Sequence, residues 1–256
     1  MSAPLLQLEK TTVQFGGLKA VADLDFHIGP RELVGLIGPN GAGKTTVFNL
    51  ITGVYRPTSG GISFAGKSVV GHRPYRITAR GIARTFQNIR LFCSLTVFDN
   101  VRTACNLHLR HGISHALFRG CGFADEEKEV DSQAMELLEI FGLANERDSD
   151  CRSLPYGDQR RLEIVRALAT KPKLLLLDEP AAGMNPTEKA ELMKLIRFTQ
   201  EKFQLAVLLV EHDMKVVMGI CERIVVLDYG QKIAEGTPHE IQRDAKVIAA
   251  YLGQES

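Results

Sequence analysis

The sequence lacks the features that mark membrane-spanning and exported chains. A membrane-spanning helix needs about 18 consecutive apolar residues, and no apolar run in this sequence is nearly that long. The longest runs, Leu174–Leu177 and Leu205–Val210, are strand-sized and end in charges. Residues 1–10 lack a basic start followed by a long apolar stretch, so no signal peptide is expected. The chain is therefore predicted to stay in the cytosol.

Charge of either sign is not in excess, and cysteine is sparse. The 256 residues include 31 basic and 30 acidic ones, which gives a formal net charge of +1. A near-neutral chain has no bulk attraction to nucleic acid or to an anionic membrane surface, so no nucleic-acid partner is predicted. The five cysteines form no CxxC pair and are interpreted as free thiols.

The apolar pattern predicts an α/β fold. Residues 5–15 and 61–67 alternate apolar and polar positions, which predicts antiparallel strands near the N-terminus. Later runs are apolar throughout, which is typical of a parallel sheet covered on both faces. These runs are Leu33–Ile37, Leu174–Leu177, Ala206–Val210 and Ile224–Leu227.

The middle of the chain has a different pattern. Residues 88–169 contain no buried strand run, and Asp125–Phe141 has apolar residues at helical spacing. We therefore predict one domain over residues 1–256, in which 1–87 and 170–256 form the α/β core. Residues 88–169 are predicted to be an inserted helical subdomain.

A glycine-rich motif lies between a predicted strand and a predicted helix, Lys44–Ile51. It fits G-x-x-x-x-G-K-[ST] in the strand–loop–helix context that the motif requires. Backbone N–H groups and the helix N-terminus favour phosphate there, Lys44 would contact the outer phosphates, and the Thr45 hydroxyl would ligate Mg²⁺. The motif residues are Gly38, Pro39, Asn40, Gly41, Ala42, Gly43, Lys44, Thr45 and Thr46. The alternative is a glycine-rich turn with a chance lysine.

Two carboxylates follow a later buried run. Asp178 and Glu179 end the stretch Leu174–Leu177. Asp178 is suited to hold Mg²⁺ through its waters, and Glu179 to take a proton from an attacking water. In the alternative interpretation, both acids merely cap the next helix.

Five further segments accompany these motifs in a fixed order. They are Val13–Gly17 with Phe15, Arg84–Asn88 with Gln87, Leu154–Gln159, Ala182–Pro186, and Val210–Asp213 with His212. In order and spacing they resemble the ATP-binding subunits of ABC transporters over nearly the whole chain. The resemblance implies a P-loop NTPase, RecA-like core with an N-terminal antiparallel β-subdomain and an inserted helical subdomain specific to that family.

The resemblance also implies roles for residues. Phe15 would stack on adenine, a contact that is worth about 1–3 kcal/mol. Gln87 would touch Mg²⁺ or the attacking water and sense the transmembrane partner, and His212 would contact the γ-phosphate. Residues 182–186 would cross a dimer interface. The signature segment that meets the partner's ATP comprises Pro155, Tyr156, Gly157, Asp158 and Gln159.

Longer segments resemble the larger ATPase subunit of branched-chain amino acid importers. They are Phe15–Val21, Arg84–Phe92, Glu179–Pro186, Glu211–Met218 and Ile248–Gly253. This implies ATP hydrolysis coupled to import, a second ATPase subunit in a hetero- or homodimer, two permease subunits and, indirectly, a periplasmic binding protein. The chain would lie at the cytoplasmic face of the inner membrane, attached through the permeases.

The signature segment departs from the family's usual Leu-Ser-Gly-Gly-Gln. Pro155 replaces the serine and offers neither a hydroxyl nor an N–H. Asp158 stands where glutamine is usual. It is expected to cap the following helix and compensate its dipole. Alternatively, it weakens the chain's contribution to the partner's site.

A run of histidines and cysteines spans residues 105–121. Its spacing matches no usual zinc pair, so a basic, partly apolar surface loop is favoured over a metal site. A docking role toward the permeases would involve Arg110 and Arg119.

Other functions remain open at this point. The closest rival is the ATPase subunit of a lipid or polysaccharide exporter. The other two are a soluble ABC ATPase that does not serve transport and a nucleotide-binding scaffold without hydrolysis.

Overall fold

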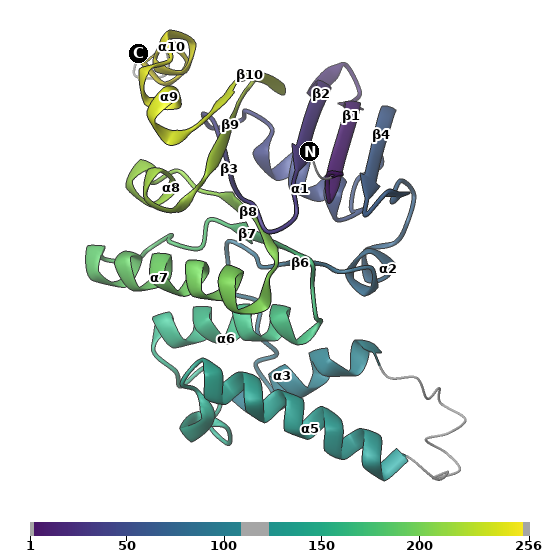
Figure 1. The fold of residues 1–256 in the computed structure, drawn as a ribbon, viewed down its shortest axis with the longest axis vertical. Coiled ribbons are helices and arrows are strands. Elements are labelled where there is room, and N and C mark those ends of the chain that lie inside the picture. The colour runs from purple at the N-terminus through teal and green to yellow at the C-terminus, as the bar shows by residue number, and fades with distance from the viewer. Residues whose placement is uncertain (1–2, 109–122, 253–256) are drawn as a thin grey trace. The chain divides into compact units, whose positions relative to one another are not determined.

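The computed structural model describes residues 3–108 and 123–252 and divides into two units (Figure 1). The first unit comprises residues 1–87 and 173–256, and the second comprises residues 88–172. The middle segment that has a helical pattern thus forms a unit of its own. Most of the histidine- and cysteine-containing run, with Arg110 and Arg119, lies outside the described residues.

The first unit contains a six-stranded sheet in the order β10-β9-β3-β8-β7-β6. Its strands are β3 (Leu33–Ile37), β6 (Ile82–Arg84), β7 (Leu174–Asp178), β8 (Ala206–Val210), β9 (Arg223–Asp228) and β10 (Gln231–Gly236). All neighbours pair in parallel except β9 and β10. Every residue of β3, β7 and β8 is buried, which explains their unbroken apolar sequence. The four predicted parallel strands are confirmed.

A second sheet of the same unit is antiparallel, in the order β2-β1-β4-β5. Its strands are β1 (Leu6–Phe15), β2 (Leu18–Ile28), β4 (Ser59–Phe64) and β5 (Lys67–Ser68). β1 pairs with both β2 and β4, which confirms the strand predicted over residues 5–15. The strand predicted over residues 61–67 is confirmed only as far as Phe64, because a turn with positive φ at Ala65 and Gly66 separates β4 from β5. Apolar side chains of β1, β2 and β4 share one buried cluster with β3 and helix α1 (Lys44–Ile51). This shared core fixes the antiparallel sheet beside the glycine-rich loop.

The remaining helices of the first unit follow or precede strands of the parallel sheet (Figure 1). They are α2 (Pro74–Ala79), α7 (Pro186–Phe203), α8 (Met214–Ile220), α9 (Pro238–Arg243) and α10 (Ala245–Leu252). A capping box starts α7, since Asn185 accepts from the Glu188 N–H and donates its own N–H to the Glu188 carboxylate. Within residues 3–108 and 123–252, the structure has no helix that is both long and apolar enough to span a bilayer.

The second unit is helical. It contains α3 (Val97–Cys105), α5 (Phe123–Ile140) and α6 (Tyr156–Ala169), with 3₁₀ turns η1 (Asn106–His108) and η2 (Ala144–Glu146). α3 packs against both α5 and α6, and Arg102 pairs with Asp131 at 2.5 Å. The helix predicted over Asp125–Phe141 is confirmed and begins at Phe123.

Candidate functional site

The glycine-rich loop connects β3 to α1 in a space that only glycine fits. A Cβ on Gly38 would lie 2.1 Å from the Leu227 carbonyl oxygen, and one on Gly43 would lie 2.7 Å from that of Ala20. Gly43 also has a φ of 99°. No side chain caps α1. The first N–H groups of the helix therefore have no side-chain acceptor from the N-cap, as is usual where a helix N-terminus binds phosphate.

Lys44 is anchored inside this loop. Its ammonium donates to the carbonyl oxygens of Gly38 and Pro39, at 2.7 and 2.9 Å. Burial lowers the pKa of Lys44, while the negative charges of Glu179 and Asp178 act in the opposite direction. The structure thus brings the loop lysine and the two strand-end carboxylates of the sequence analysis into one site.

Asp178 has a partner that the sequence analysis missed. Its carboxylate lies 2.7 Å from the Arg84 guanidinium, and each side chain is 9% exposed. Arg84 also donates to Asn49 of α1 at 2.7 Å. A pair buried to this degree depends on both partners, because removing one costs about 3–5 kcal/mol. Arg84 follows two apolar residues of β6, and this position is the one sequence signal that could have pointed to its pairing with Asp178.

Glu179 meets two of the residues predicted to act with it. Its Oε2 accepts a hydrogen bond from Gln87 at 2.7 Å, and the Nδ1 of His212 lies 3.7 Å from the same oxygen. Glu179 has a φ of 46°, a left-handed conformation that is strained for a residue with a side chain. Its N–H donates to the Val210 carbonyl at 2.8 Å, which holds that conformation in place.

Two contacts connect more distant segments to the glycine-rich loop. The hairpin of β1 and β2 approaches Gly43 through Ala20 and carries Phe15, whose ring packs edge-on against Tyr55 at 5.0 Å and is 46% exposed. From α10, Tyr251 lies beside the Gly38 backbone, and burial raises the pKa of this phenol. No role for Tyr251 is predicted from the sequence.

The signature segment begins α6 in the second unit. Pro155 is the N-cap residue, and no side chain caps the helix. The expectation that Asp158 caps it is therefore wrong: the carboxylate pairs instead with Arg161, one turn on, at 3.0 Å. Asp158 still lies in the first turn, where a negative charge opposes the helix dipole.

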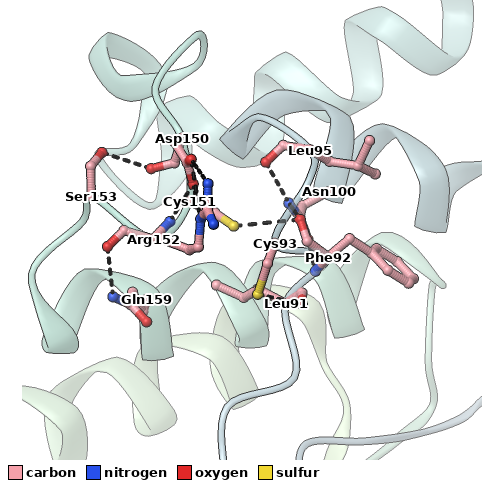
Figure 2. A network of polar contacts seen from close by, with 10 residues as sticks. All are labelled: Leu91, Phe92, Cys93, Leu95, Asn100, Asp150, Cys151, Arg152, Ser153 and Gln159. Carbon is pink, nitrogen blue, oxygen red and sulfur yellow. Dashed lines mark hydrogen bonds and ion pairs between the residues drawn. The ribbon is translucent and has the colours of Figure 1, made fainter.

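The backbone before α6 is fixed by a polar network (Figure 2). The Gln159 amide donates to the carbonyl of Leu154 at 2.8 Å and reaches that of Arg152 at 3.5 Å. Cys151 and Asn100 both contact the Phe92 carbonyl, at 3.5 and 3.2 Å. Gln159 thus shapes the signature loop from within. Cys93, Cys105, Cys151 and Cys221 are free thiols, as expected.

The first unit alone defines a class of protein. Lys44 is held in a glycine-rich loop at a helix N-terminus. It faces Asp178 and Glu179 at the end of β7, which is separated from β3 by one strand of the sheet. This arrangement is suited to binding a nucleoside triphosphate. The chain is a P-loop nucleotide-binding protein.

Comparisons with known proteins narrow this class. The family described as "ABC transporter" matches residues 21–182, and "Branched-chain amino acid ATP-binding cassette transporter" matches residues 231–256. The high-affinity branched-chain amino acid transport ATP-binding protein LivG of Salmonella typhimurium is 45% identical over 254 residues, 99% of this chain and 100% of LivG.

Two solved structures are also similar. The ADP conformation of MJ1267, an ATP-binding cassette of an ABC transporter, has a TM-score of 0.85 at 29% identity and covers 99% of this chain and 100% of its own. A dimeric post-hydrolysis state of the ATP-binding cassette MJ0796, bound to ADP and Pi, has a TM-score of 0.74 at 25% identity and covers 91% and 98%. The chain belongs to the ABC transporter family, as one of its ATP-hydrolysing cassettes.

Proposed function

We propose that this chain energises an importer of branched-chain amino acids by hydrolysing ATP. One observation carries the substrate class. The similarity to LivG extends over 99% of the chain, and residues 231–256 match a segment described for branched-chain amino acid cassettes in particular. The lipopolysaccharide export ATP-binding protein LptB of Haemophilus influenzae matches a similar length, 98% of the chain, but at 33% identity against the 45% of LivG.

ATP binding is assigned to the first unit. The loop N–H groups and the ammonium of Lys44 hold the phosphates, and the exposed ring of Phe15 offers a face on which adenine stacks. The buried pair of Asp178 and Arg84 connects β6 and β7 beneath the loop. This connection keeps the carboxylate in place when triphosphate charge enters.

Hydrolysis is assigned to Glu179 as general base. Its carboxylate accepts the proton of a water attacking the γ-phosphorus, while Gln87 and His212, both beside Oε2, orient the water and the γ-phosphate. Glu179 has its left-handed backbone directly after β7, and its side chain is 23% exposed, whereas every residue of β7 is buried. Strain at this one residue thus serves to place the base.

The donor set fits Mg²⁺. The hydroxyl of Thr45 and the carboxylate of Asp178 are hard oxygen ligands, the amide oxygen of Gln87 is a third, and Lys44 lies close to Asp178. When bound, the ion would neutralise charge on the outer phosphates. The protein's own part is to keep these oxygens oriented toward the phosphate loop.

Turnover is proposed to need two cassettes. Each ATP would be enclosed between one chain's phosphate loop and the signature segment, residues 154–159, of another. ATP then favours the closed pair and hydrolysis favours reopening, which moves two attached permease subunits. The chain would lie at the inner face of the membrane and depend indirectly on a periplasmic binding protein. The ADP- and Pi-bound cassette MJ0796 supports pairing, since it is a dimer.

Transport by reconstituted complexes tests the substrate class. Vesicles that contain the chain and its co-purified membrane partners, supplied with the periplasmic binding protein on the substrate side, are expected to take up leucine, isoleucine and valine only with ATP. Lys44→Ala vesicles are expected to take up none. Arginine uptake by the same vesicles serves as the specificity control. ATP-dependent extraction of a lipid or polysaccharide without leucine uptake would refute the proposal in favour of an exporter.

Restoring a serine at the signature segment is expected to accelerate turnover. Pro155 has φ −52° and ψ 151°, extended values that a serine N-cap also adopts. Pro155→Ser supplies a hydroxyl and an N–H where proline has neither, so we expect the ATPase rate of the assembled complex to rise about 2–10-fold. The serine cap should also stabilise α6 by about 0.5–2 kcal/mol. An unchanged rate would show that the proline costs nothing.

A further inference from the structure

Glu211 is a buried carboxylate between the two loops of the hydrolytic site. It directly follows β8, and its side chain is 0% exposed. Val210 and Asp178 are register partners on neighbouring parallel strands, so Glu211 and Glu179 leave the sheet side by side. The sequence predicts no role for Glu211, because an acid beside a histidine in a loop has no distinctive pattern.

The hydrogen bonds of Glu211 bridge those loops. Its Oε1 accepts the Ala181 N–H at 2.6 Å, two residues after Glu179. Its Oε2 accepts the N–H of His212 at 3.2 Å and lies 3.5 Å from that of Asp213. Burial raises the pKa of Glu211, whereas these N–H groups and His212 lower it. The Glu211 carboxylate therefore accepts hydrogen bonds from the segment after Glu179 and from the segment of His212.

The bridge connects the segments that carry Glu179 and His212. The turn that contains Glu179 is held at its start by the Val210 carbonyl and, two residues later, by Glu211. The far end of the same segment is fixed by the capping box of Asn185 and Glu188. His212 is held by the opposite oxygen of Glu211, with its Nδ1 3.7 Å from Glu179. Movement of either loop must therefore act on the other.

We propose that Glu211 is a positioning residue that sets the distance between Glu179 and His212 for ATP hydrolysis. Its side chain is fully buried and accepts hydrogen bonds from backbone N–H groups of both loops. Through Ala181 it also connects His212 to the segment of residues 182–186. The proposal depends on the proposed roles of Glu179 and His212, and it adds the group that couples them.

Glu211→Gln tests this with almost no change in size. An amide can accept the Ala181 N–H with its oxygen, but its NH₂ then faces the N–H of His212, donor against donor. We expect kcat of the full-length chain in its transporter complex to fall about 10–100-fold, the range that a displacement of about 1 Å produces. The KM for ATP should change less than twofold, because the phosphate loop is untouched.

Two further variants separate bridging from other effects. Glu211→Asp keeps the charge but is one methylene shorter, so its carboxylate can accept from the His212 N–H but cannot reach the Ala181 N–H. Its kcat is therefore expected to stay as low as that of Glu211→Gln. Ile196→Val, a buried change in α7, is the control for destabilisation and should leave kcat at the parental level. Parental kcat in Glu211→Asp would mean that Glu211 is only a local cap and would overturn the bridge.

A double-mutant cycle completes the test. If Glu211 acts through Glu179, then Glu211→Gln should cost nothing further in single-turnover hydrolysis by Glu179→Gln, and the two losses should not add. Additive losses, or parental kcat in Glu211→Gln while Glu179→Gln is inactive, would overturn the positioning role alone. Parental activity in Glu179→Gln would instead refute the proposed function of the site.

Discussion

Replacing Glu179 by Gln is expected to slow ATP hydrolysis about 10²–10⁴-fold, the contribution that a general base makes. Glutamine is isosteric and has a similar tolerance for the left-handed backbone at this position, so the fold around φ 46° is preserved. It cannot accept the proton of the attacking water. The ammonium of Lys44 and the phosphate loop are unchanged, so ATP still binds but is converted to ADP only slowly.

The consequence of slow hydrolysis is a trapped dimer. Two Glu179→Gln chains should remain closed around unhydrolysed ATP, which light scattering and size-exclusion chromatography with labelled ATP would detect as a dimer that retains nucleotide. Glu191→Gln, an exposed change on α7, is the matched control and should turn over normally. Hydrolysis by Glu179→Gln at the parental rate would remove Glu179 from the role of general base.

The regular parts of the fold could be predicted because their signals are local. Leu33–Ile37 and Ala206–Val210 are buried on both faces and thus read as unbroken apolar runs. β2 was missed: it starts with two exposed residues, alternates irregularly, and is paired through a bulged register with β1. β6 has only three residues and owes its place to pairing with β7. The sequence of a short segment does not reveal which distant strand it pairs with.

The residues of the candidate site also differ in whether their signals are local. Lys44 and Glu179 lie in contiguous motifs whose chemistry is evident from the residues themselves. Arg84 and Glu211 act through partners 94 and 30 positions away, Asp178 and Ala181, so only the folded sheet discloses them. Asp158 shows the opposite error. Its place in the first turn predicts a capping role, but its carboxylate pairs instead with Arg161, one turn away.

Lys44→Ala is expected to abolish both ATP binding and turnover. The ammonium faces Asp178 and Glu179, so without it two carboxylates and a triphosphate would share the site with no compensating lysine. A hydrogen bond from a charged donor contributes about 1.5–3 kcal/mol, so ATP affinity should fall at least about 10–100-fold. Loss of transition-state stabilisation lowers the hydrolysis rate by a further factor of about 10²–10³, so hydrolysis should fall below detection.

Thermal unfolding distinguishes lost binding from lost folding. A ligand at about 100 times its Kd stabilises a protein by about 2.7 kcal/mol, so ATP should raise the Tm of the parental chain and not that of Lys44→Ala. Without nucleotide the two Tm values should be close, because burial lowers the pKa of Lys44 and the loss of its contacts with Gly38 and Pro39 is offset by relief of that desolvation. Lys67→Ala, an exposed change in β5, is the control that should keep the shift. An ATP-induced rise in Lys44→Ala equal to the parental one would place the phosphates elsewhere.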